Sequence, residues 1–254
     1  MREWRQRRHL SQLDLATEID ISARHLSFVE TGRSQPSRCM VLKLAESLDV
    51  PLRERNALLV SAGYAPMYAA RPLTDPSMSA ARDAVDLILK GHEPYPALLV
   101  DRHWTLLNAN RTALHFFEKI SPDLLKPPIN VLRATLHPEG LAPIIENLPQ
   151  WRSHVLARLA RDLELTADAT LAELLTELRG YPGGEEPLDS ELPGVVVPIR
   201  ARTAAGTVSM FSTTTVFGTA VEVTLSELVF EAFYPADEAT ADILRQLAGR
   251  LAAS

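Results

Sequence analysis

Residues 11–33, SQLDLATEIDISARHLSFVETGR, contain two short amphipathic segments in direct succession. Each segment opens with a serine, Ser11 or Ser22, and serine is a favoured helix N-cap because its hydroxyl accepts a hydrogen bond from an unpaired backbone amide. Asp14, three residues after Ser11, completes a variant of the capping box. Because only two residues link the segments, the helices must cross at a steep angle. This is helix-turn-helix geometry.

The pattern around this stretch extends the helical prediction over residues 1–66. Apolar residues recur at helical spacing from Leu10 to Leu59. Gly63 and Pro66 end the last helix, since neither residue continues a helix well. Residues 67–79 contain two prolines and no clear period. The sequence therefore predicts an all-α domain over residues 1–66, followed by a linker over residues 67–79.

Residues 80–254 mix helical and strand patterns. Strands are predicted at 97–101, 105–110, 195–203, 207–216 and 221–233, and a polar loop at 181–194. Helices are predicted at 79–90, 110–117 and 241–251, and over most of 131–180 with breaks at Pro138, Pro149 and Thr166. Asn110 is the expected N-cap of its helix. This order of elements favours an α+β domain with an antiparallel sheet and helices packed on one side.

Charge is distributed unevenly along the chain, whose formal net charge is −6. Residues 1–66 contain ten Lys/Arg and eight Asp/Glu, whereas the remaining residues contain sixteen and twenty-four. The basic excess lies in Arg2, Arg5, Arg7 and Arg8. A cationic end on an acidic protein indicates a surface that faces a polyanion, although a solvated helix face would carry the same charges.

Several classes of protein are disfavoured by what the sequence lacks. Cys39 is the single cysteine, which excludes a disulfide framework. No apolar run reaches the roughly 18 residues of a transmembrane helix, and the basic N-terminus lacks the apolar region of a signal peptide. Zinc-protease, serine-hydrolase, phosphate-loop and dinucleotide fingerprints are missing, and the seven histidines show no ligand spacing. We expect a cytoplasmic protein that is not an enzyme and holds no metal.

The opening stretch resembles the repressor-like helix-turn-helix of the XRE family. The resemblance rests on the SQ opening, Ala16, the Ile19/Ile21 pair and the E-x-G-R ending at Arg33. The longer run over residues 24–68 is similar to the MmyB-like regulators, in which a PAS-like ligand-binding domain follows the helix-turn-helix. Over residues 80–254 the resemblance rests on the order of elements and on VDRHWTLLNANRTAL at 100–114.

The resemblance assigns DNA contacts by position. Arg24 would read a base, since a guanidinium fits guanine bidentately, and Ala23 and Phe28 would touch thymine methyl groups. Gln12 and Ser22 would contact phosphates, although both would also cap helices without DNA. The complete set of implied DNA contacts is Arg7, Gln12, Ser22, Ala23, Arg24, His25, Phe28, Arg33, Ser34 and Ser37. Arg5 and Glu30 occupy positions that pair in related repressors.

The resemblance also implies a cavity that holds a fatty acid or another mostly apolar ligand, and no other cofactor. Its predicted lining is Trp104, Phe116, Phe117, Leu136, Trp151, His154, Val155, Arg158, Phe211 and Phe233. His154 and Arg158 share a helix face, and an arginine at the pocket mouth would hold a carboxylate bidentately. Ordinary core packing, or a surface pair in the case of His154 and Arg158, would give the same pattern.

These inferences predict a bacterial transcriptional regulator. Its expected partners are a two-fold symmetric duplex operator, a small-molecule effector and a second copy of the chain, with no membrane. Two alternatives remain open at the level of sequence. Residues 80–254 could be an enzyme domain tethered to DNA, with a buried polar cluster. They could also serve only to pair subunits, with a filled core and an exposed apolar face.

Overall fold

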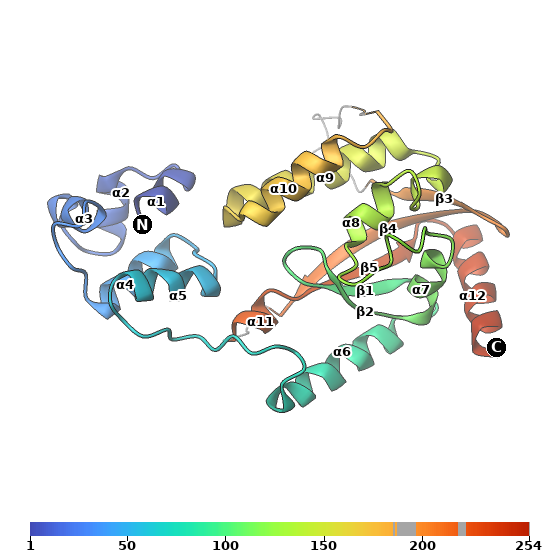
Figure 1. The fold of residues 1–254 in the computed structure, drawn as a ribbon, viewed down its shortest axis with the longest axis horizontal. Helices are drawn as coiled ribbons and strands as arrows, with labels where there is room; N and C mark the ends of the chain where they lie inside the picture. Colours follow the sequence, from blue (N-terminus) through green and yellow to red (C-terminus); the bar gives the residue numbers. More distant parts are fainter. Residues whose placement is uncertain (185, 187–196, 218–221, 254) are drawn as a thin grey trace. The chain divides into compact units, whose positions relative to one another are not determined.

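The computed structural model describes residues 1–184, 186, 197–217 and 222–253, and it divides into two compact units. The first unit is Met1–Pro72 together with Glu164–Thr166 and the described part of Gly218–Ser226. The second unit contains the remaining described residues from Leu73 onwards. Figure 1 shows the helices of Met1–Pro72 and, in the second unit, a sheet with helices.

The first unit is built on the predicted helix-turn-helix. Its helices are α1 (Arg2–Arg7), α2 (Gln12–Glu18), α3 (Ala23–Glu30), α4 (Arg38–Ser47) and α5 (Leu52–Ser61). Ser11 and Ser22 cap α2 and α3 through hydrogen bonds of 3.1 Å, and Asp14 completes the capping box. Asp20 has φ 60° in the tight turn, a left-handed conformation that Asp tolerates better than most residues. The predicted caps and turn are therefore confirmed.

The core of the first unit consists of leucines that project from several helices. Leu15, Leu26, Leu44 and Leu48 are fully buried, as helical spacing predicts. After α5, the Asn56 side chain accepts hydrogen bonds from the backbone amides of Met67 and Tyr68 and donates to the carbonyl of Tyr68. These bonds hold the start of the predicted linker against α5.

The second unit contains one antiparallel five-stranded sheet with the order β2-β1-β5-β4-β3. Its strands are β1 (Ala97–Val100), β2 (Leu106–Ala109), β3 (Ile199–Thr203), β4 (Gly206–Val216) and β5 (Val229–Pro235). β1 and β5 pair in the centre, so the two ends of this unit's sequence meet in the middle of the sheet. The α+β class predicted from the sequence is confirmed.

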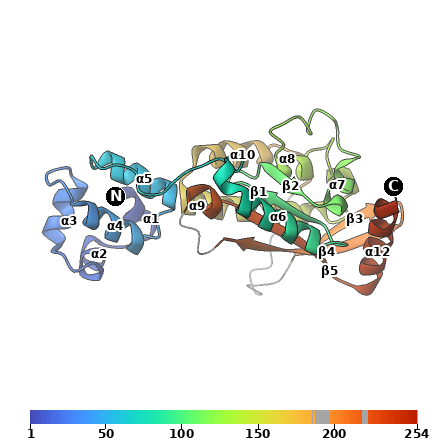
Figure 2. The same ribbon diagram turned by 90° about the horizontal axis from the view of Figure 1, so that it is seen from below.

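Helices cover both faces of the sheet (Figures 1 and 2). They are η1 (Pro76–Met78), α6 (Ser79–Gly91), α7 (Arg111–Phe117), α8 (Val131–Leu136), η2 (Ala142–Ile144), α9 (Leu148–Thr166), α10 (Ala169–Arg179) and α12 (Glu238–Ala253). Leu98 and Val100 of β1 join the main core with α8, α9 and α10. Leu99 points to the opposite face, where Val85 of α6 lies close to it. The helix predicted over 79–90 is present as α6, but it lies on the opposite face from α8, α9 and α10, so the expectation of helices on one side only is corrected.

Two predictions of local structure are wrong. The strand predicted over 221–233 begins only at Val229, and a short helix, α11 (Val223–Ser226), precedes it. The Glu222 side chain accepts a hydrogen bond from the Leu225 amide, which favours this helical turn. The break predicted at Pro149 lies instead over residues 145–147, because Pro149 is in the first turn of α9, where no backbone donor is needed. The loop predicted at 181–194 falls largely outside the described residues.

None of the helices in the described part of the chain is long and apolar enough to span a bilayer.

Candidate nucleic-acid interface and ligand cavity

α3 has the features expected of a recognition helix. Ser22 caps its N-terminus, and Arg24 in its first turn is exposed. The guanidinium carbon of Arg24 lies 5.4 Å from the centre of the Phe28 ring. This cation–π contact orients the arginine along the helix face and uses Phe28 as a platform. Arg24 and Phe28 therefore form one surface feature, which the sequence assignment treated as two separate contacts.

The Arg5–Glu30 pair braces α1 against α3. Two hydrogen bonds of 2.7 and 2.9 Å join the guanidinium to the carboxylate, and Arg5 also donates to the carbonyl of Leu10 at 2.9 Å. The side chain of Glu30 is fully shielded from solvent. Burial alone would raise the pKa of Glu30, but the hydrogen bonds from Arg5 and Gln12 lower it overall. The expected pair is present and ionised.

Gln12 is the third member of this cluster. Its side-chain amide donates to Glu30 at 2.7 Å. The resemblance implies a phosphate contact for Gln12, whereas in the structure its amide nitrogen donates to Glu30 of α3. Gln12 is half-buried. It is the first residue of α2, which is the position that the resemblance implies.

The other predicted DNA residues have different environments. Arg7 on α1 and Arg33 after α3 are exposed, while Ala23 and His25 are half-buried. The Ser34 amide donates to the carbonyl of Phe28, and the Ser37 hydroxyl caps α4 through the Met40 amide. Exposure therefore leaves the guanidinium groups of Arg7, Arg24 and Arg33 available to an anion, while Ser22 and Ser37 act as caps.

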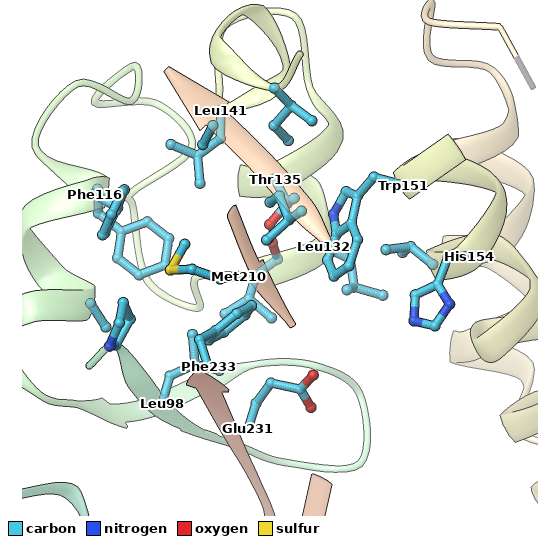
Figure 3. A pocket seen from close by; sticks show the side chains of 18 of the residues that line it. Leu98, Phe116, Leu132, Thr135, Leu141, Trp151, His154, Met210, Glu231 and Phe233 are labelled. Atoms are coloured by element: carbon cyan, nitrogen blue, oxygen red, sulfur yellow. The ribbon is translucent and has the colours of Figure 1, made fainter. Parts of the chain in front are cut away.

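The second unit contains a cavity of about 100 Å³ between the inner face of the sheet and the helices that cover it. Its walls come from β1, α7, α8, η2, α9, β3, β4 and β5. Figure 3 shows Leu98, Phe116, Leu132, Leu141, Met210 and Phe233 arranged around it, so most of the lining is aliphatic or aromatic. Ligand pockets generally have such walls, with a few polar groups that orient the bound molecule.

Eight of the ten predicted lining residues surround this one cavity. They are Trp104, Phe116, Phe117, Trp151, His154, Val155, Arg158 and Phe233. Leu136 is not among them, since it is fully buried in the core and Thr135 lines the cavity instead. Phe211 points to the opposite face from Met210, because adjacent strand residues alternate, and it stacks on Tyr234 at 5.6 Å. These two placements correct the prediction.

An ion pair forms the polar end of the cavity. Arg158 donates to the two carboxylate oxygens of Glu231 at 2.8 and 2.9 Å, and to the hydroxyl of Thr214 at 2.6 Å. The guanidinium carbon of Arg158 lies 4.5 Å from the centre of the Trp104 ring. Glu231 is only 4% exposed. The arginine expected to clamp a ligand carboxylate is thus already neutralised by a carboxylate of the protein.

Titrating groups around this pair have shifted pKa values. Burial lowers the pKa of His154, and the nearby charge of Arg158 lowers it further. Burial raises the pKa of Asp162, against the effects of Arg158 and of a hydrogen bond from Trp104. His154 also stacks on Trp151, with ring centres 5.4 Å apart. At neutral pH the histidine is therefore uncharged and adds no positive charge to the cavity.

Trp151 supplies a polar atom with no partner. Its indole nitrogen is buried and makes no hydrogen bond to any described residue. Figure 3 shows this nitrogen on the side of the ring that faces Thr135, away from His154. Most buried donors in proteins are paired, so this N–H is a feature that an acceptor on a ligand would satisfy.

Sequence reasoning missed Glu231 and Thr135 in the cavity wall. Glu231 had a usable signal, because it interrupts the otherwise apolar strand VFEAFYP at 229–235. A carboxylate is rarely buried in a strand without a partner. Within the described ranges, no group of three or more His, Cys, Asp or Glu side chains is placed to hold a metal ion.

Two family models match the chain, one over the helix-turn-helix and one over the part that contains the cavity. A family model for the MmyB-like transcription regulator ligand binding domain matches residues 81–247, and a helix-turn-helix model matches residues 1–55. Curated proteins give no match. One similar solved structure is described as "Structure of an RNA-binding Light-Oxygen-Voltage Receptor", with 14% identity and a TM-score of 0.31. The match covers 94% of this chain and 55% of that chain, so this chain spans about half of its length.

Proposed function

The chain belongs to the family of MmyB-like transcription regulators, which combine a DNA-binding helix-turn-helix with a ligand-binding domain, and from this premise we propose that its effector is a small, mostly apolar molecule. The observation that carries the proposal is the cavity in the second unit, with its largely aliphatic and aromatic lining. A small molecule with an aliphatic body fits such walls. The cavity also disfavours the alternative that residues 80–254 serve only to pair subunits, because that alternative predicts a filled core.

The DNA-reading part of the proposal assigns different roles to neighbouring side chains. Arg24 reads a base edge from the first turn of α3, with its guanidinium held over Phe28. Arg7 and Arg33 are exposed and contact phosphates. Glu30 keeps α3 in place through Arg5, and so contributes to binding through structure rather than contact.

The regulator acts as a homodimer on a two-fold symmetric operator. A single recognition helix reads only a few base pairs, whereas a dimer reads two half-sites about 34 Å apart. A ligand changes this binding only if it has different affinities for the two states of the protein. The proposed switch is therefore a change in the spacing or angle of two helix-turn-helix domains when the cavity is occupied.

Selection of binding sequences from random duplex DNA with the full chain tests the proposal. The expected product is a palindromic site bound by two chains, which native mass spectrometry of the complex would count. Arg24→Ala should relax the preference at one base pair of each half-site, whereas Arg33→Ala, the matched exposed arginine, should weaken all sequences alike. Selection of no sequence, or of a site bound by one chain, would contradict the proposed dimeric reader.

A further inference from the structure

We propose that the ligand of this cavity is electrically neutral and that its polar group is a hydrogen-bond acceptor that receives the indole N–H of Trp151. This inference rests on the proposed function, because it takes the cavity to be the effector site. It goes beyond an apolar ligand by specifying the charge of the molecule and the place of its one polar contact.

The first observation is the unpaired donor. Trp151 is 5% exposed, lines the cavity, and its indole nitrogen finds no acceptor among the residues that the structure describes. The nitrogen lies on the cavity side of the ring, toward Thr135 (Figure 3). The Thr135 hydroxyl itself donates to the carbonyl of Val131 at 2.7 Å. A buried donor without a partner destabilises a protein, and an acceptor atom of a ligand removes that cost.

The second observation is the state of the charged groups. Both carboxylate oxygens of Glu231 accept from Arg158, and Thr214 hydrogen-bonds to both side chains. The carboxylate is almost completely buried and also forms part of the cavity lining. An anionic ligand at this end would lie beside a fixed negative charge, and none of the described residues that line the cavity offers an unpaired cation to compensate it. Such an arrangement rejects carboxylates, because an uncompensated buried charge is costly.

The third observation is size. A cavity of about 150 Å³ holds one benzene molecule, so a cavity of about 100 Å³ has room for roughly four to six heavy atoms. The matched probes 2-butanone, butane and butyrate therefore isolate the two features: the ketone adds an acceptor to the alkane, and the carboxylate adds a charge.

Calorimetric titration of the full chain with these three probes tests the proposal. The wild type should bind 2-butanone at least about 10-fold more tightly than butyrate. Trp151→Phe keeps an aromatic ring and removes the N–H, so it should weaken 2-butanone about 5- to 10-fold while leaving butane within about 2-fold. Glu231→Gln should reverse the charge preference and raise butyrate affinity about 10-fold or more, because Arg158 then lacks its own carboxylate.

A measurement on the wild type keeps the test independent of variant folding. The indole ¹⁵N–H signal of Trp151 should move downfield with 2-butanone and stay in place with butane, as expected for a new hydrogen bond. Tighter binding of butyrate than of 2-butanone would overturn the proposal, as would equal losses for ketone and alkane in Trp151→Phe. Failure of all three probes to bind would also overturn it. DNA selection with the same protein would then still succeed or fail on its own, so the two proposals can be refuted separately.

Discussion

The two units each contain a bidentate Arg–Glu pair with a buried carboxylate, and the pairs have different surroundings. In the first unit, Arg5 donates to Glu30 and to the Leu10 carbonyl, and the Gln12 amide also donates to Glu30. In the second unit, Arg158 and Glu231 lie at the edge of a cavity, under the ring of Trp104.

This difference shows that the same kind of ion pair has different consequences in a packed helical cluster and at the wall of a cavity. The Arg5–Glu30 pair is largely shielded from solvent and joins α1 to α3, so it holds the orientation of that helix. The Arg158–Glu231 pair forms part of a cavity wall, so it fixes the charge of that wall as well as its shape. Both pairs contribute little net stability over apolar replacements but destabilise the fold strongly when one member is removed.

Breaking the Arg5–Glu30 pair should have the largest effect on stability. Arg5→Ala leaves the carboxylate of Glu30, whose side chain is fully shielded, without its charge partner. We expect a loss of about 3–5 kcal/mol in the unfolding free energy of the first unit. Hydrogen exchange of amides in α2 and α3 would measure it. The control is Arg7→Ala on the same helix: this side chain is exposed, so stability should change by less than about 0.5 kcal/mol. Equal effects of the two substitutions would mean that the pair does not brace α3.

Breaking the pair at the cavity should have the second largest effect. Arg158→Ala leaves Glu231 buried and unpaired, but the Arg158 side chain is 25% exposed, so water offsets part of the penalty. A loss of about 2–3 kcal/mol in the second unit is expected from the lower end of the range for buried pairs. Exchange of amides in β5 provides the readout. Arg161→Ala, an exposed arginine on the same helix, is the control and should be close to neutral. A larger loss than for Arg5→Ala would reverse the proposed ranking of the pairs.

The next comparison lies within the first unit, between a side chain expected to contact DNA bases, Arg24, and one that holds the recognition helix in place, Gln12. Arg24→Ala should cost about 1–3 kcal/mol in specific DNA binding, with little change in stability. Gln12→Ala removes a hydrogen bond to Glu30, so it should reduce stability by about 0.5–1.5 kcal/mol and weaken all DNA sequences alike. Fluorescence anisotropy with matched and mismatched duplexes, next to thermal unfolding, separates the two. A sequence-specific loss with Gln12→Ala would make it a base reader instead.

The smallest expected effect is a difference in the pH dependence of the two units. Burial, with help from Arg158, lowers the pKa of His154 in the folded state. Its contribution to stability is therefore complete above the unfolded pKa of about 6.5 and is lost as pH falls through the lower folded pKa. Glu30 also has a lowered pKa, but its contribution is complete above the unfolded value of about 4.3 and is lost only at more acidic pH.

Acidification from about pH 7 should thus weaken the second unit before the first. Hydrogen exchange followed per unit would detect this order, and His154→Gln should remove the early loss. If the first unit weakened first, or if His154→Gln had no influence on the profile, the assignment of this window to His154 would be wrong.

Most of the first unit could be predicted from the sequence. Ser11, Ser22 and Asp20 specify two caps and a tight turn within a dozen residues, and these are local effects that tertiary contacts rarely override. Even the partnership of Arg5 with Glu30 followed from the family resemblance. The role of Gln12 did not, because its hydrogen bond to Glu30 depends on how α2 packs against α3.

The cavity could be predicted only in part. Aromatic and aliphatic positions pointed to a core, and many of them surround one space, but sequence cannot tell a filled core from a hollow one. The misplaced Phe211 shows the limit for strands: a shift of one residue exchanges the two faces of a sheet. Likewise, residues 221–233 were read as a strand because their β-branched residues outweighed the capping of α11 by Glu222.

The sequence by itself determined the helix-turn-helix, the α+β order of elements and the class of the protein, because caps, turns and hydrophobic periodicity act over a few residues. Only the tertiary structure decided the chemistry of the cavity. Arg158 and Glu231 lie 73 residues apart, and Trp151 lacks an acceptor only because of what surrounds it. Pairing, burial and the loss of a hydrogen-bond partner are properties of the packed state, so they appear when distant segments come into contact.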